Sequence, residues 1–126
     1  MEISWFVEML TLNKEQKMSR KRFIAIHTFH SEDSKKAFQA MNAEDTQTEE
    51  EWFATWTFEK CQCIATWVGD DDFFFCHWYA ESEDAIYETL EKTGFATFMI
   101  TLPCEMPRFV TKYDVKNTLM DNPDST

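Results

Sequence analysis

The most regular pattern of apolar and polar positions in the chain lies between Phe73 and Gly94. The apolar run from Phe73 to Ala80 is too short for a helix of its own and predicts a buried strand. Ser82 follows as an expected helix cap, with acidic residues in the first turn after it. The inner face of this helix is expected to consist of Ala85, Ile86, Thr89, Leu90 and Thr93. Gly94 then fits the left-handed position at which many helices end.

The first half of the chain shows the same order of strand and helix. Residues 21–30 contain an apolar run with the length of a strand, and Ser31 is expected to cap a helix that extends to about Asn42. Thr48 and Glu51 lie three positions apart, which is the capping-box pattern of a second, shorter helix.

Two further strands are predicted at residues 61–68 and 95–102, with a turn at 69–72 and with Pro103 ending the last strand. The resulting order is strand–helix–strand–strand–helix–strand. The sequence therefore predicts an α+β, ferredoxin-like βαββαβ fold, a four-stranded antiparallel sheet with helices on one face.

The chain has 126 residues, which is enough for one domain. We expect residues 1–20 to be an N-terminal extension, 21–108 the ferredoxin-like domain and 109–126 a polar C-terminal tail. The extension is either a short helix packed on the domain or an appendage ahead of a start at Met18. The apolar residues of such a helix would be Trp5, Phe6 and Leu10.

Side chains alternate across a strand, so the predicted hairpin assigns residues to two faces of the sheet. An even loop at 69–72 places Ala65 opposite Cys76 and Trp67 opposite Phe74, on the side expected to carry the helices. The other face would carry Phe75, His77 and Tyr79. Helices cover only one face of this fold, and an exposed apolar sheet face usually binds a ligand or a partner. We therefore expect a homodimer that pairs two such faces.

The formal net charge of the chain is -11, and a domain this acidic repels phosphate backbones. Nucleic-acid binding is therefore not expected. No apolar run approaches the roughly 20 residues of a membrane span, and the apolar patch at 3–12 lacks the basic leader of a signal peptide. The four cysteines are then expected to be reduced thiols in a cytoplasmic protein.

Two histidines are the candidate metal ligands. His27 lies on the first strand and His77 on the third, and these strands are neighbours in the ferredoxin-like order. A transition metal such as nickel or zinc takes imidazole ligands. The sequence does not fix whether His27 shares the face of His77. On the face of His77, Phe75 and Tyr79 are the candidate ligand-binding residues. The strand cysteines (Cys61, Cys63 and Cys76) lack the usual zinc spacing and are interpreted as small buried hydrophobes.

The segment Phe75–Ser82, with Ala85-Ile86 and Thr93-Gly94 after it, resembles a family of small ferredoxin-like proteins often labelled nickel-binding or of unknown function. The similarity covers about residues 21–102. It implies a dimeric α/β barrel and metal binding. The acidic, Trp-rich segment at 44–58 is an insertion relative to that family.

These patterns lead to a first hypothesis, a non-catalytic dimeric protein that binds a small ligand or a metal on the open sheet face. The alternative is a dimeric-barrel enzyme, of the cofactor-independent monooxygenase or isomerase type, with His77 as general base. A third hypothesis is an interaction module whose acidic surface docks a basic partner. Nucleophile, phosphate-loop and dinucleotide motifs are absent from the sequence.

Overall fold

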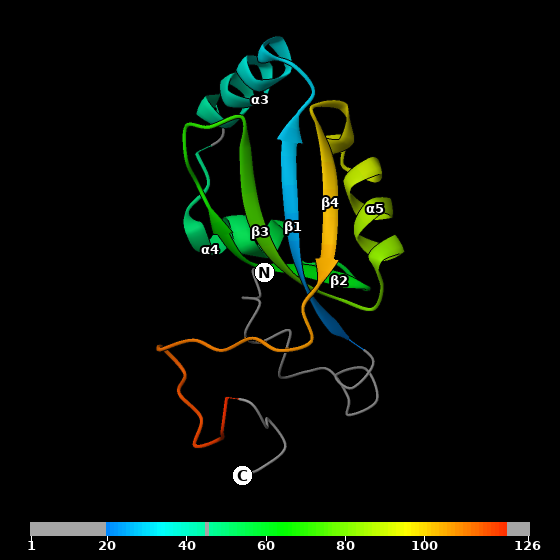
Figure 1. The fold of residues 1–126 in the computed structure, drawn as a ribbon. Coiled ribbons are helices and arrows are strands. Elements are labelled where there is room, and N and C mark those ends of the chain that lie inside the picture. The colour runs from blue at the N-terminus through cyan, green and yellow to red at the C-terminus, as the bar shows by residue number, and fades with distance from the viewer. Residues whose placement is uncertain (1–19, 45, 121–126) are drawn as a thin grey trace.

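The structure is a computed structural model in which residues 20–44 and 46–120 are described. The elements in chain order (Figure 1) are β1 (Lys21–Phe29), α3 (Glu32–Glu44), α4 (Glu49–Thr55), β2 (Cys61–Trp67), β3 (Phe73–Ala80), α5 (Glu83–Lys92), the 3-10 helix η1 (Phe95–Thr97) and β4 (Met99–Glu105). The helix considered for Trp5, Phe6 and Leu10 lies outside the described residues.

The four strands form one sheet in the order β2-β3-β1-β4, and every neighbouring pair is antiparallel. Within residues 20–44 and 46–120, three α-helices accompany this open sheet (Figure 1). The predicted α+β class is confirmed, and the arrangement fits the ferredoxin-like class.

Local capping signals in the sequence match the observed helix ends. Thr48 Oγ1 accepts a hydrogen bond from the Glu51 amide, and the Thr48 amide donates one to the Glu51 carboxylate, so the predicted capping box is present at α4. Ser82 caps α5 by accepting from the Ala85 amide. Gly94 follows α5 with φ of 84°, the left-handed conformation that was predicted.

The prediction for the last strand was wrong at both ends. Residues 95–97 form a 3-10 turn after Gly94, and β4 begins only at Met99 and continues through Pro103 to Glu105. The amide of Met106 donates to the carbonyl of Arg22, and the ladder alternates from there, so the nitrogen of Pro103 faces away from β1. Since β4 is an edge strand, proline costs no ladder hydrogen bond at this position.

The predicted register of the hairpin was also wrong in part. Cys63 pairs with Trp78 as expected, but the register shifts between Cys63 and Ala65. This bulge moves Trp67 into line with Phe75, on the face opposite the helices. An extra residue in one strand reverses the facing of everything beyond it, and the periodicity of the sequence does not reveal that residue.

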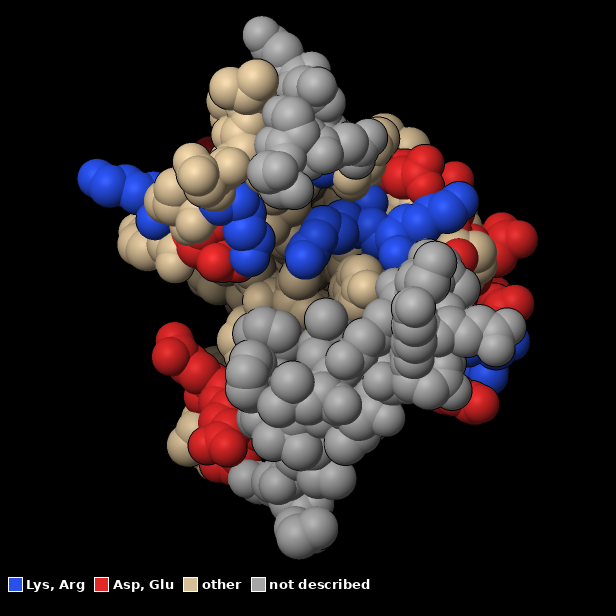
Figure 2. Space-filling view, turned by 90° about the horizontal axis from the view of Figure 1, so that it is seen from below, with Lys and Arg blue, Asp and Glu red and all other residues tan. Residues whose placement is uncertain are grey.

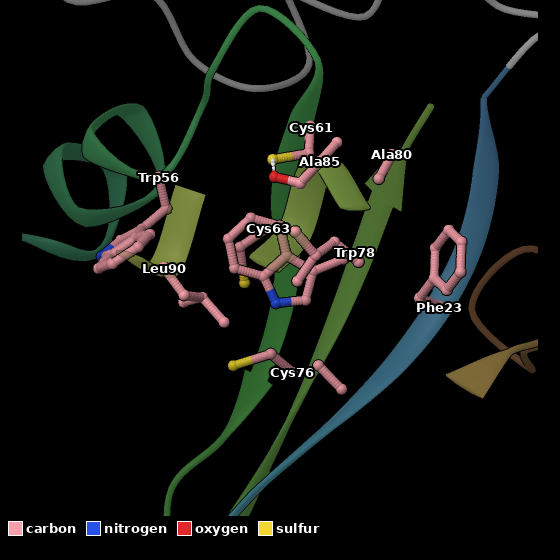
Figure 3. Close-up of a cluster of buried hydrophobic side chains, with 11 residues drawn as sticks. Phe23, Trp56, Cys61, Cys63, Cys76, Trp78, Ala80, Ala85 and Leu90 are labelled. Atoms are coloured by element: carbon pink, nitrogen blue, oxygen red, sulfur yellow. Dashed lines mark hydrogen bonds between the residues drawn. The ribbon is translucent and has the colours of Figure 1, made fainter. Parts of the chain in front are cut away.

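The core lies between the sheet and the helices (Figure 3). Trp78 and Ile86 are among its largest fully buried side chains. At one end, α3 is tied to the β2–β3 turn because Lys35 Nζ donates to the carbonyl of Asp70 at 2.7 Å and pairs with the Asp72 carboxylate at 3.2 Å. At the outer side of β2, the backbone of Trp56–Phe58 bonds to the first residues of the strand.

The opposite end of the molecule carries a different charge pattern. Seen from below, Lys and Arg side chains gather across the middle of this end, and Asp and Glu lie toward its margins (Figure 2). Part of this basic charge comes from the start of β1, where Arg20, Lys21 and Arg22 follow one another in the chain. The net charge of -11 is therefore unevenly distributed.

We expect Gly94→Ala to lower the free energy of unfolding by about 1 kcal/mol, because an alanine side chain strains a backbone with positive φ. Open space surrounds the position, so the cost comes from the backbone alone. Gly69→Ala is the matched control, since Gly69 also has open space around it and has no positive φ. Urea unfolding of the two variants measures the difference; equal stability would contradict the conformational explanation.

Candidate functional site

A cavity of about 560 Å³ lies on the helix side of the sheet, bordered by α3, α4 and the β2–β3 turn. Its volume falls within the range of about 300–1,000 Å³ that is usual for small-molecule sites. The cavity has aromatic walls, a floor of small polar and sulfur-containing side chains, and an acidic, polar mouth. We call it the aromatic cavity.

Aromatic side chains from three helices and β3 make up the walls. The Phe38 ring lies 6.0 Å from Phe74 and 5.1 Å from Phe95, and Trp56 lies 4.4 Å from Phe95. Trp52 adds a further ring 6.1 Å from Trp56. Planar faces and edges of this kind favour a flat, largely apolar ligand.

The floor is formed where β1, β3 and β2 run side by side. Ala25 pairs with Cys76 and His27 with Phe74, so His27 and Cys76 are diagonal neighbours on the helix side. Thr66 of β2 lies opposite Cys76. Cys76, His27 and Cys63 all line the cavity although each is buried.

Hydrogen bonds connect these floor residues. His27 Nδ1 lies 2.7 Å from Thr101 Oγ1, and Cys76 Sγ lies 3.4 Å from Thr66 Oγ1. The side chain of Cys63, followed by that of His27 with its charge, lowers the pKa of Cys76, although burial opposes this. The interaction with Cys76, together with burial, raises the pKa of Cys63. Cys76 is therefore the sulfur atom that these neighbours favour as a thiolate.

One further polar atom lies beside this floor. The indole nitrogen of Trp78 is buried and has no hydrogen-bond partner among the described residues. Trp78 also lines the cavity, directly across the ladder from Cys63 (Figure 3). A buried donor without a partner costs about 1–3 kcal/mol, and an acceptor atom on a bound ligand would recover that energy.

The mouth of the cavity is polar and acidic. Its charged residues are Glu49 at the start of α4 and Asp70 and Asp71 in the β2–β3 turn, and no Lys or Arg lines the described cavity. Anionic ligands are therefore disfavoured at the entrance, whereas neutral or cationic ligands are not.

The structure does not bring the two predicted metal ligands together. His77 of β3 pairs with Ile24 of β1. His27 lies three residues beyond Ile24 on β1 and pairs with Phe74. Because side chains alternate along a strand, the two imidazoles lie on opposite faces of the sheet. Across residues 20–44 and 46–120, no group of three or more His, Cys, Asp and Glu side chains is arranged to hold a metal ion.

The predicted open-face residues Phe75, His77 and Tyr79 do share one face, because alternate residues of β3 carry them. The chain itself covers part of this face. The Phe109 ring lies 4.7 Å from the His77 ring, and the Arg22 guanidinium lies over both Phe109 and Tyr79 at 5.2 and 5.4 Å.

This packing makes His77 a weak base. Burial, reinforced by the Arg22 charge, lowers the pKa of His77 to about 4 from its ordinary 6.5. Its Nε2 lies 3.4 Å from Arg22 Nη1, and His77 does not line the aromatic cavity. These contacts give no support to His77 as a general base.

The candidate-site residues that the sequence did not indicate are the cysteines and the aromatic side chains of the cavity. Cys63 and Cys76 were interpreted as buried hydrophobes, and Trp52 and Trp56 are spaced as a core pair on a helix. The available signal was His27, a titratable residue in an apolar strand. Only the register shows that His27 and Cys76 lie on one face.

Comparisons of the chain with protein-family models, curated proteins and solved structures gave no significant match. The resemblance inferred from Phe75–Ser82, with its nickel-binding label, therefore remains a prediction. No helix within residues 20–44 and 46–120 is both long and apolar enough to cross a membrane.

The lowered pKa of His77 makes stability depend on pH. Between about 6.5 and about 4, the unfolded chain takes up a proton at this residue and the folded chain does not, so stability falls as the pH is lowered. We expect His77→Gln to reduce the loss of unfolding free energy between pH 7 and about pH 5. Urea unfolding of both proteins at the two pH values measures this loss of unfolding free energy. If the variant lost as much as the wild type, the pH dependence would not come from His77.

Proposed function

We propose that this protein binds a small, flat, neutral or cationic aromatic ligand in the aromatic cavity. The proposal keeps the small-ligand binding expected from the sequence and moves the site from the open face to the helix face. The observation that carries it is a cavity of about 560 Å³ whose walls are aromatic and whose buried lining includes an unpartnered donor, Trp78 Nε1.

The chemistry of the lining supports each property of this ligand. The rings of Phe38, Phe74 and Trp52 favour a planar apolar body. Trp78 Nε1 has no hydrogen-bond partner, which favours a ligand with an acceptor atom at the end that enters the cavity. The carboxylates of Glu49 and Asp71 at the mouth disfavour an anionic group.

The other hypotheses gain less support. A metal site shared by His27 and His77 would need both imidazoles on one face, and the register separates them. An enzyme that uses His77 as a base would need a cavity beside that side chain, but its ring packs against Phe109. Binding in the aromatic cavity requires neither a metal held by both histidines nor a base at His77.

Dye binding tests the proposed site. We expect Nile red, a neutral planar dye, and thioflavin T, a cationic one, to bind with a saturable rise in fluorescence, and anilinonaphthalene sulfonate, an anion, to bind far more weakly. Trp52→Ala should weaken Nile red binding at least about tenfold, which corresponds to about 1.4 kcal/mol. Circular dichroism of the variant shows whether the fold is kept.

Trp67→Ala is the matched control, because this tryptophan is 52% exposed and lies on the open face. It should leave the dye affinity unchanged. The reverse pattern, with loss of binding in Trp67→Ala and none in Trp52→Ala, would return the site to the open face and contradict the proposal.

We further propose that the open face pairs with a second copy of the chain. An apolar band on it consists of Trp67, Phe73, Ile100 and Leu102, and Ile100 and Leu102 are 63% and 54% exposed. The register puts no carboxylate among the strand positions of this face. In a protein of net charge -11, such a surface allows two copies to approach without strong repulsion.

Leu102→Glu should shift the protein toward monomer, because it places a carboxylate within the apolar band of both copies. Tyr113→Glu is the control, since Tyr113 is exposed and lies outside the band. Sedimentation velocity measures the oligomeric state. A wild-type protein that is monomeric at micromolar concentration would rule the dimer out and leave ligand binding in the cavity unaffected.

A further inference from the structure

Cys76 lies at the floor of the aromatic cavity within a group of chemically active side chains. Its Sγ donates to Thr66 Oγ1 at 3.4 Å, and His27 and Cys63 line the same cavity beside it. Simple binding of an apolar ligand would use none of these groups. Their gathering beneath an accessible cavity is therefore unexplained by binding alone.

His27 is the diagonal neighbour of Cys76 on the helix side of the sheet, and it is among the side chains that lower the pKa of Cys76. Its Nδ1 is engaged with Thr101 Oγ1 at 2.7 Å, on the β4 side of the ring. When Nδ1 donates to that hydroxyl, Nε2 keeps a lone pair that can accept the Cys76 proton. A thiol beside a base that is itself oriented by a third group is the usual arrangement of an activated cysteine nucleophile.

Cys63 is poorly placed to form a disulfide with Cys76. Cys63 pairs with Trp78, and the residue opposite Cys76 is Thr66. Diagonal positions on neighbouring strands have Cα atoms about 7–8 Å apart, whereas a disulfide needs no more than about 6.8 Å. The Cys63 thiol instead donates to the carbonyl of Ala65 at 3.4 Å.

We propose that Cys76 is a nucleophile that adds covalently to a neutral, aromatic α,β-unsaturated carbonyl compound held in the aromatic cavity. This inference rests on the proposed binding function, because the cavity must first hold the aromatic part of the compound. It adds to that function the class of ligand and the reacting atom.

The addition balances without any further reactant. The Cys76 proton passes to His27, and the sulfur forms a bond to the β-carbon of the ligand. The π electrons of the carbon–carbon double bond become those of an enolate, and the proton from His27 then ends on the α-carbon. Nothing leaves, nothing is oxidised, and the product is the thioether of Cys76.

Trp78 completes this site. Its side chain lines the cavity beside Cys63 (Figure 3), and the oxygen of the ligand's carbonyl is the acceptor that its buried, unpartnered Nε1–H lacks. Negative charge develops on this oxygen during the addition. A donor that meets the charge as it forms stabilises the transition state more than the bound ligand.

Two maleimides of matched reactivity test the proposal on the full chain. N-phenylmaleimide carries the aromatic ring, whereas N-methylmaleimide has the same reactive group without it. We expect N-phenylmaleimide to modify Cys76 at a rate that saturates with its concentration and falls when Nile red is present. N-methylmaleimide should modify Cys76 more slowly, at a rate that rises linearly with its concentration. Intact mass and peptide mapping identify the modified residue.

Variants assign the roles. Cys76→Ser should abolish the saturable reaction, and Cys104→Ser should leave it unchanged, because Cys104 is on β4 and does not line the cavity. His27→Gln should slow the reaction about tenfold or more near neutral pH and much less near pH 9, where a thiol ionises without help. If His27 had a purely structural role, the reaction of the variant would be equally slow, relative to the wild type, at both pH values.

Other outcomes overturn the inference. If N-phenylmaleimide modifies Cys104 and spares Cys76, or reacts linearly and regardless of Nile red, Cys76 is not the nucleophile of this cavity. If Nile red binds in a manner that depends on Trp52 while Cys76 stays unmodified, the covalent step fails and the binding function stands. If neither the dye nor the maleimide uses the cavity, both proposals fail.

Discussion

The pairing of β1 with β3 at the centre of the sheet is the interaction on which the rest of the structure depends. Its register places Phe23 against Trp78 and Ala25 against Cys76, all on the helix side. A slip of one residue would turn Trp78 toward the open face and bring His77 into the core. The register of this one strand pair therefore determines which side of the sheet Trp78, the cavity floor and His77 occupy.

Features that depend on a few neighbouring residues could be predicted from the sequence. Thr48 and Ser82 cap helices, and Gly94 ends one, because each acts through backbone groups within one helical turn. The α+β class followed from the order of these elements. The length of β4 could not be predicted in this way, because whether Pro103 ends a strand depends on whether that strand lies at an edge.

The candidate site could not be predicted from the sequence either, because it also depends on how the strands are arranged in the sheet. Its floor joins His27 of β1 to Cys76 of β3, and its walls bring Trp52 of α4 over them. Each residue has an ordinary structural interpretation by itself. Their chemistry depends on which side of the sheet each occupies, and one extra residue near Ile64 changes that assignment along β2.

Pro103 limits pairing between the edges of two sheets. An edge strand normally offers its outward amides to another chain, and runaway growth of a shared sheet is the hazard. In β4 the proline removes one such amide from the middle of the row, and at the other edge the Trp56–Phe58 backbone occupies the start of β2. Within the described residues, both edges of the sheet therefore disfavour the addition of strands from another chain, and the pairing of open faces that we propose needs neither edge.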